Sequence, residues 1–312
     1  MMILLVHKRL IAICLIYFVL VGCSVIKKTD FKNNKEIFNE KNKIKVNPFF
    51  AYNFGGLEKL TPKEQINTLK KYGYDGITLR MAKAEHVDQF LEFSKIIDNT
   101  EDFKIYSVFV RYNFADTDTD RNRWKEVVDL IENKDIDLWF IFGKPEQGID
   151  DNHVEGVLRN VVTYSASKNV TVTLYPHSWC YFYTAEQSLP MVKKINHPNL
   201  KLAVHTCHEL KAGYAGRLAE VVDNVRGYIS FVTIAGASNE VDMTSRKTMD
   251  NTSILPLEDS EYDFAPFLKA LNNIDYKGPV GYINFGFDKN LDDYLPKSME
   301  EWKRLKNNYL KN

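Results

Sequence analysis

Two short apolar runs in the middle of the chain each lead into histidine, the side chain whose ordinary pKa lies closest to neutral pH. The first run, residues 170–177, reads Val-Thr-Val-Thr-Leu-Tyr-Pro-His and ends on His177. The second, residues 200–213, reads Leu-Lys-Leu-Ala-Val-His-Thr-Cys-His-Glu-Leu-Lys-Ala-Gly and contains His205 and His208. Because imidazole can accept or donate a proton near working pH, His177 and His208 are the first candidates for acid/base catalysis, with hydrogen bonding to backbone as the alternative.

Charged side chains follow other apolar runs. Arg80 ends the run 75–80, where its guanidinium could bind a carboxylate or a sugar oxyanion, or form a salt bridge within the protein. Lys144 and Glu146 lie in the turn sequence Gly-Lys-Pro-Glu-Gln-Gly. Glu146 could act as a general base there, or it could face solvent.

The loop after His177 is rich in aromatic side chains, which could stack on sugar rings or cover the protein's own core. These side chains are Trp179, Tyr181, Phe182 and Tyr183. Lys211 follows His208 and could bind a phosphate or carboxylate, or lie solvated at the surface.

Strand-like and helix-like patterns alternate along residues 47–312. The histidine runs supply strands five and six; the other strands are predicted at 49–54, 75–80, 103–112, 137–143, 228–235 and 278–285. Helices are predicted at 62–72, 86–97, 124–133, 151–167, between strands five and six, and at 214–225, 262–272 and 291–308. Eight such units predict one α/β domain, a (β/α)8 barrel of roughly 250 residues, whose site lies where the strands end. Further strand-end candidates are Tyr52, Asn53, Arg111, Tyr175, Thr233 and Asn284.

The two histidine runs resemble those of the xylose isomerase-like TIM barrels, a family also described as sugar phosphate isomerases/epimerases. In that family one strand closes on Glu-Pro-x or Glu-x-His and the next on Asp-x-x-His. Here Tyr175 stands at the glutamate position and His205 at the aspartate position. The resemblance implies a TIM barrel in which His177 and His208 contact the substrate or assist proton transfer.

The same resemblance bears on metal binding. Metal-dependent members hold a divalent ion with Glu, Asp, His and Glu, one from each of the last four strands. The matching positions here fall near Tyr175, His205, Thr233 and Asn284, with Ile283 as the other candidate for the last. Tyrosine, threonine and asparagine are poor ligands for Mn²⁺ or Mg²⁺, so the resemblance implies that the usual site is absent and no cofactor is assigned.

A substitute zinc site is an alternative, with His177, His205 and His208 as three imidazole ligands. Residues three apart on an extended strand point to opposite faces. The alternative therefore requires the chain to bend near Thr206, directly after His205.

The N-terminus carries the parts of a secretory signal. Lys8 and Arg9 precede the apolar run 10–21, which is shorter than the ~20 residues of a membrane span. Leu-Val-Gly-Cys then resembles the lipobox of bacterial lipoproteins, which implies that Cys23 is lipidated and begins the mature chain. An uncleaved anchor helix is the alternative.

The predicted organisation is therefore a signal peptide at 1–22, a flexible tether at 23–46, and the barrel at 47–312. The lipid would hold the barrel in the cell envelope. By resemblance to bacterial sorting rules, Ser24 after the lipidated cysteine favours the outer membrane, facing the periplasm. Cys180 and Cys207 would then lie in an oxidising compartment, where a disulfide between them is one of two alternatives.

Charge excludes one class of partner. The chain has 41 basic and 41 acidic side chains, so no overall field attracts nucleic acid. A small carbohydrate is the expected ligand, and the membrane is the expected partner of the lipid anchor.

Three functions remain open. The first is a sugar isomerase/epimerase-like enzyme that removes a proton next to a carbonyl, giving isomerisation, epimerisation or β-elimination. His177, His208 and Glu146 would share the acid/base work, and the substrate would be bound by Arg80, Lys144, Tyr175, Trp179, Lys211 and Asn284. The second is a non-catalytic carbohydrate-binding lipoprotein on a degenerate barrel, and the third is a structural envelope lipoprotein.

Overall fold

The computed structural model describes residues 45–310, so the predicted signal peptide and Cys23 lie outside the described residues. The described part from Val46 onward forms one compact unit. Within residues 45–310, no helix has the length and apolar character needed to cross a membrane.

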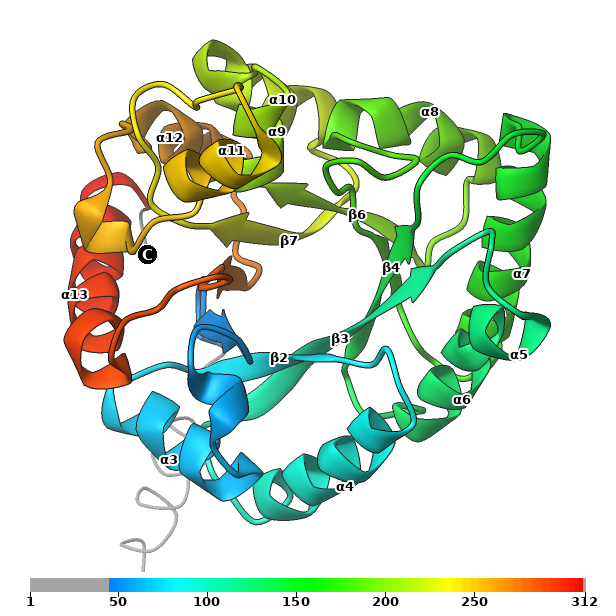
Figure 1. The fold of residues 1–312 in the computed structure, drawn as a ribbon, viewed down its shortest axis with the longest axis horizontal. Coiled ribbons are helices and arrows are strands. Elements are labelled where there is room, and N and C mark those ends of the chain that lie inside the picture. Colours follow the sequence, from blue (N-terminus) through cyan, green and yellow to red (C-terminus); the bar gives the residue numbers. More distant parts are fainter. Residues whose placement is uncertain (1–44, 311–312) are drawn as a thin grey trace, which may run out of the picture. The chain divides into compact units, whose positions relative to one another are not determined.

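Eight parallel strands close into a barrel in sequence order, with the helices arranged around it (Figure 1). The strands are β1 (Phe49–Tyr52), β2 (Gly76–Arg80), β3 (Lys104–Tyr112), β4 (Asp137–Phe142), β5 (Val172–Leu174), β6 (Leu200–His205), β7 (Ile229–Ile234) and β8 (Val280–Tyr282). The outer helices are α3 (Pro62–Lys71), α4 (Glu85–Ile97), α6 (Arg123–Leu130), α7 (Asp151–Ser167), α8 (Ala185–Ile195), α10 (Leu218–Val225), α12 (Ala265–Asn273) and α13 (Leu291–Tyr309). The predicted fold class, a single (β/α)8 barrel, is confirmed.

Local sequence explains where helices begin. At the start of α3, the Thr61 hydroxyl accepts a hydrogen bond from the Glu64 amide, and the Glu64 carboxylate accepts one from the Thr61 amide at 2.9 Å. Pro62 occupies the first turn, where its missing N–H costs nothing. This reciprocal cap satisfies amides that the helix cannot, as the Thr-Pro-Lys-Glu sequence predicts.

Aromatic side chains fill the interior of the barrel beneath the strand ends. The ring of Trp139 lies 5.1 Å from that of Phe231, and Phe50 stacks on Tyr106 at 4.9 Å between centroids. Gly281 in β8 leaves room for this layer, because a Cβ there would lie 2.7 Å from the Phe50 ring. The barrel is therefore closed below and can hold a ligand only above this layer.

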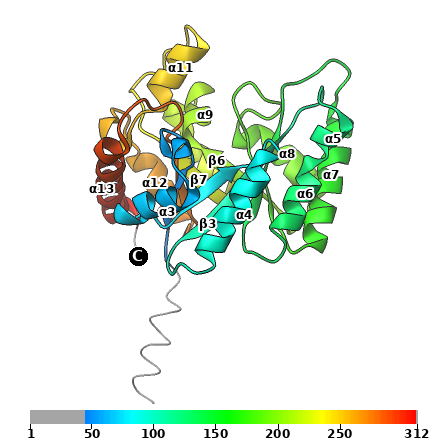
Figure 2. The ribbon, with the colours of Figure 1, turned by 60° about the horizontal axis from the view of Figure 1, so that its bottom comes forward.

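Three further helices occupy the loops that follow strands: α5 (Asp118–Arg121), α9 (Thr206–Lys211) and α11 (Arg246–Ser253). None was predicted. Helix α11 buries only Met249 and Ser253, so its sequence shows no apolar stripe that would reveal a helix. Figure 2 shows α11 above α9, projecting from one end of the barrel.

Candidate functional site

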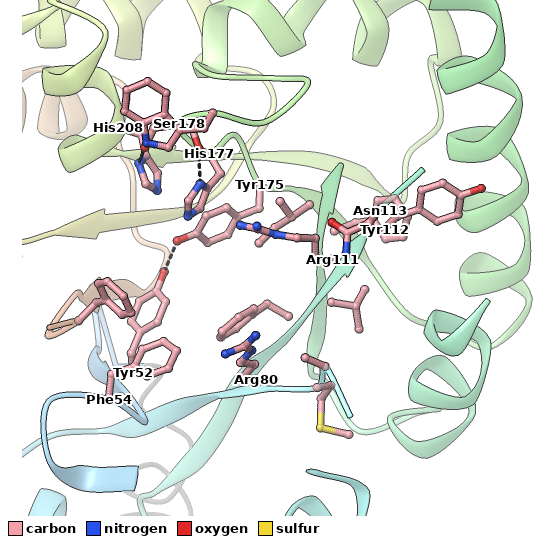
Figure 3. A pocket seen from close by; sticks show the side chains of 18 of the residues that line it. Tyr52, Phe54, Arg80, Arg111, Tyr112, Asn113, Tyr175, His177, Ser178 and His208 are labelled. Carbon is pink, nitrogen blue, oxygen red and sulfur yellow. Dashed lines mark hydrogen bonds between the residues drawn. The ribbon is translucent and has the colours of Figure 1, made fainter. Parts of the chain in front are cut away.

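A cavity of about 560 Å³ opens where the strands end, a size suited to a small ligand (Figure 3). Arg80 lines it from the last position of β2, and Arg111 from the end of β3. Tyr175 and His177 line it from the segment after β5, and His208 from α9. The cavity thus lies at the strand ends, where the alternating pattern predicts a site.

His177 has one ring nitrogen fixed and one available. Its Nδ1 lies 2.7 Å from the carbonyl oxygen of Ser178, and a carbonyl can only accept, so Nδ1 carries the proton. Nε2 therefore has the lone pair. Burial, assisted by the positive charges of Arg111, Lys211 and Arg246, lowers the pKa of His177 to about 4. The imidazole is neutral at neutral pH and can accept a proton.

His208 is held next to His177. Its Nδ1 shares a hydrogen bond of 2.8 Å with the Ser178 hydroxyl, and the two imidazole rings lie 4.2 Å apart between centroids. Burial lowers the pKa of His208 well below its ordinary value, and the neighbouring His177 contributes in the same direction. Ser178 therefore orients both histidines, a role that the sequence did not reveal.

His205 lies deeper than the other two histidines. Its Nδ1 is 2.5 Å from the Thr233 hydroxyl, and its ring packs 3.5 Å from that of Tyr175. The chain bends after His205 into α9, so His205 and His208 approach within 5.7 Å between ring centroids. The bend that the zinc alternative requires is thus present. Nε2 of His205 is buried and has no hydrogen-bond partner among the described residues.

Two tyrosines form a hydrogen-bonded pair at the cavity floor. The hydroxyls of Tyr52 and Tyr175 lie 3.0 Å apart. Burial raises the pKa of both phenols far above the ordinary value, so they remain protonated and one of them has a hydrogen to donate. Trp139 packs against both rings and fixes the pair from below.

The aromatic loop after His177 divides between two roles. Trp179 lines the cavity with 36% of its surface exposed, held there by a backbone φ of 67°, a left-handed conformation that is rare for a bulky residue. Phe182 is buried against Phe142, and Tyr183 donates a hydrogen bond to a backbone carbonyl at 3.1 Å. Of these side chains, only Trp179 is placed to contact a ligand in the cavity.

Lys211 is buried, so its interpretation as a solvated surface residue is wrong. Only 2% of its side chain is exposed, and its ammonium lies 2.5 Å from the Asp250 carboxylate. Lys211 of α9 and Asp250 of α11 both line the cavity, and so does Arg246, the first residue of α11. Arg246 and Asp250 escaped prediction because they belong to a helix that has no apolar pattern.

Three of the residues assigned to catalysis or substrate binding do not line the cavity. Lys144 and Glu146 are exposed in the loop after β4, and neither belongs to the residues that line the cavity. Asn284 is buried, and its amide donates to the Phe54 carbonyl at 2.6 Å. Asn284 points out of the barrel because side chains alternate along β8, and Ile283 is the one that points inward.

The donor set does not fit the divalent metal site of metal-dependent relatives. The four inward positions on the last strands hold Tyr175, His205, Thr233 and Ile283, which offer one imidazole and no carboxylate. Among residues 45–310, no group of three His, Cys, Asp or Glu side chains is arranged to hold a metal ion. Cys180 and Cys207 are both buried and both free, so the disulfide alternative does not describe this structure.

The chain was compared with known proteins. The family described as xylose isomerase-like TIM barrel matches residues 66–305. No curated protein matches the chain.

Solved structures with the same fold include the IolI protein with a zinc atom (TM-score 0.64, 16% identity, covering 84% of this chain and 98% of that chain). The probable 3-DHS dehydratase AsbF from Bacillus anthracis has a TM-score of 0.67 at 14% identity, with 82% and 98% covered. D-allulose 3-epimerase from Methylomonas sp. in complex with D-allulose has a TM-score of 0.60 at 17% identity, with 83% and 97% covered. At these identities the likeness concerns the fold.

Proposed function

The chain belongs to the family of xylose isomerase-like TIM barrels, and from that premise we propose that it is an enzyme that modifies a sugar or sugar derivative by removing a proton next to a carbonyl. Solved relatives by fold include a dehydratase and epimerases, and the D-allulose 3-epimerase binds a sugar. Fold alone does not determine function, so the proposal depends on the site.

His177 carries the proposal. It combines a neutral imidazole, an Nε2 lone pair and a position on a cavity large enough for a sugar. General-base catalysis needs these three properties together. Among the described residues, two carboxylates are weaker candidates for the base than His177. Asp250 is paired with Lys211, and Glu146 lies outside the cavity.

The proposed step is written from His177. Nε2 takes the proton from the carbon next to the carbonyl, the C–H bond breaks, and its electron pair moves to the carbonyl oxygen to form an enolate. A phenol hydrogen from the Tyr52–Tyr175 pair is available to stabilise that oxygen. Delivery of a proton to the opposite face by a second donor gives an epimer. Protonation of the former carbonyl carbon, with loss of the hydroxyl proton from the deprotonated carbon, gives an isomer, and departure of a leaving group with its electron pair gives elimination.

Solvent-exchange measurements test this function. The purified protein is incubated in D₂O with a panel of aldoses, ketoses and sugar acids, and loss of the proton next to the carbonyl is followed by NMR. We expect exchange with at least one sugar and a fall of roughly 100-fold or more in His177→Gln. The exposed His153 on α7 supplies the control His153→Gln, which should exchange at the unchanged rate. Exchange that is equal in both variants would contradict the role of His177.

A binding protein without catalysis is the second candidate. Its support is the absence of carboxylates at the four inward strand-end positions, together with aromatic side chains such as Trp179 and Phe285 on the cavity wall. This candidate predicts that sugars bind and raise the melting temperature while no proton exchanges in the same samples.

The proposed location rests on the sequence. A basic start, a short apolar run and Leu-Val-Gly-Cys support delivery across a membrane and a lipid on Cys23, in the envelope of a bacterium. Membrane fractionation after expression tests this. The natural chain should sediment with membranes and Cys23→Ser should not, whereas sedimentation of both would favour an uncleaved anchor helix.

A further inference from the structure

The cavity carries an excess of positive charge that the protein itself does not neutralise. Seven cationic side chains line it, whereas the chain as a whole is balanced at 41 basic and 41 acidic residues. Four of the seven have carboxylate partners, namely Lys83, Arg121, Arg123 and Lys211. The remaining three are Arg80, Arg111 and Arg246, whose side chains form no ion pair and no hydrogen bond with the described residues 45–310.

The acidic side chains of the cavity are already engaged. Asp250 binds Lys211 at 2.5 Å, and Asp120 binds Arg123 at 3.0 Å. Asp116 accepts a hydrogen bond of 2.9 Å from the Asn113 amide. None of these three carboxylates forms an ion pair with Arg80, Arg111 or Arg246.

Two of these guanidiniums come from neighbouring strands. Arg80 pairs in register with Phe109, and Arg111 lies two residues beyond Phe109 on the same face of β3. Figure 3 shows both side chains pointing into the space that Tyr175 and His177 also face. The charge of Arg111 also acts on His177, where it helps to lower the pKa. A negative group bound at Arg111 would thus occupy the same cavity as the proposed base.

We propose that the substrate is a sugar acid, and that Arg80 and Arg111 bind its carboxylate. The planar guanidinium matches a carboxylate through two parallel N–H···O bonds, and an unpaired guanidinium in a cavity retains its full capacity to form them. Phosphate groups in this fold frequently bind after strands seven and eight, where the third unpaired guanidinium, that of Arg246, lies. The carboxylate assignment therefore depends on Arg80 and Arg111, which belong to β2 and β3. This inference rests on the proposed function, because it names the substrate class of the same site.

The assignment also suits the chemistry. A carbon next to an ionised carboxylate gives up its proton poorly, because the electron pair released from the C–H bond would add charge to an anion. Guanidiniums that neutralise the carboxylate allow that pair to enter it as an enediolate while His177 takes the proton. Carboxylate binding and proton removal would then occur at adjacent atoms of one substrate.

Calorimetric titration with matched sugars tests the inference. The full chain is kept in a detergent that carries no sugar and titrated with glucose and glucuronate, with galactose and galacturonate, and with glucose 6-phosphate. The variants are Arg80→Gln, Arg111→Gln and Arg226→Gln. Arg226 is exposed after α10, at the opposite end of the barrel, so its variant removes the same charge far from the cavity.

We expect each uronate to bind at least tenfold more tightly than the matching neutral sugar. Arg111→Gln and Arg80→Gln should each weaken uronate binding by roughly 10- to 100-fold, while Arg226→Gln leaves it unchanged. Melting curves of the free variants check that all three fold. Equal binding of uronate and neutral sugar, unaffected by either cavity variant, would overturn this inference and leave the proposed function standing.

Two other outcomes count against the proposals in different ways. Tighter binding of glucose 6-phosphate than of both uronates would overturn the carboxylate assignment. Absence of binding by every sugar, together with absence of proton exchange, would overturn both the sugar acid assignment and the proposed function.

Discussion

A single hydrogen bond determines which nitrogen of His177 can act as a base. The Ser178 carbonyl holds the proton on Nδ1, and Ser178 also contacts His208 through its hydroxyl. Neighbouring residues along the chain thus set the tautomer of one histidine and the orientation of another. The resulting pair of neutral imidazoles is the most specific chemical feature of the cavity.

The pKa of His177 predicts the pH dependence of proton exchange. A base must be unprotonated, so the exchange rate should rise as pH increases through about 4 and remain level from there to neutral pH. If His177 had the ordinary histidine pKa of 6.5, the exchange rate would already fall below pH 6.5. Exchange measured between pH 3.5 and pH 8 distinguishes the two, and a midpoint near 6.5 would show that His177 is not desolvated as described.

Two helices that follow strands, α9 and α11, are joined through the buried Lys211. Its ion pair with Asp250 attaches a largely polar helix that carries Arg246 to the cavity wall. Helix α9 also supports α8, because a carboxyl oxygen of Glu209 accepts a hydrogen bond of 2.8 Å from the Ala185 amide. Electrostatic contacts therefore hold these elements where apolar packing is sparse.

Asp250→Ala tests the attachment of α11. The substitution leaves a buried ammonium without its partner, so we expect the free energy of unfolding to fall by about 3 kcal/mol. Urea denaturation measures the change. The control is Asp259→Ala, which removes the partner of Lys289 from an exposed ion pair and should alter stability by less than about 0.5 kcal/mol. Equal effects of the two substitutions would contradict a buried pair at Lys211.

Glu209 predicts how stability changes with pH. Burial raises its pKa from 4.5 to about 8, so between these values the folded chain retains a proton that the unfolded chain has released. Stability due to this group is fully present below pH 4.5 and is lost as pH rises to about 8. In Glu209→Gln the unfolding free energy should decrease less steeply as pH rises. We expect the slope to differ from that of the natural chain by up to about 1.4 kcal/mol per pH unit.

Urea midpoints at pH 5, 6, 7 and 8 measure that slope. Glu300→Gln, at an exposed position on α13, is the matched control and should retain the slope of the natural chain. The half-buried Asp137, with a pKa raised to about 7, acts in the same direction and is unaltered in both variants. An unchanged slope in Glu209→Gln would show that its carboxyl is ionised in the folded chain.

At the scale of the whole barrel, closure brings together side chains that lie far apart in the sequence. Tyr52 in β1 meets Tyr175 after β5, and Lys211 meets Asp250 from the loop beyond β7. The same closure places Thr233 and Ile283 at inward positions where metal-dependent relatives use carboxylates and imidazole. These inward positions therefore present a phenol, a hydroxyl and one imidazole, and no carboxylate for a divalent cation.

Chelation tests this property of the whole site. We expect the melting temperature and sugar binding to remain unchanged after treatment with a chelator, and elemental analysis to find no stoichiometric metal. A stoichiometric zinc ion that is lost in His208→Ala would contradict this prediction and revive the site formed by His177, His205 and His208.

The sequence predicted much of the barrel because its signals are local. Alternating apolar runs identified all eight strands, and the Thr-Pro-Lys-Glu cap located the start of α3. Strand ends correctly indicated Arg80, Tyr175, His177 and His208 as cavity residues. Helix α11 escaped prediction because its few buried residues give no periodic pattern.

The fold class and the line of candidate residues at the strand ends were thus determined by the sequence alone, since hydrophobic periodicity and capping act over a few residues. Only the tertiary structure decided which candidates share a cavity. It turned Asn284 outward and Ile283 inward, left Glu146 in solvent, and buried Lys211 against Asp250. The charge state of the histidines was decided at this level too, because burial and charges from distant segments, which no local pattern records, set their pKa values.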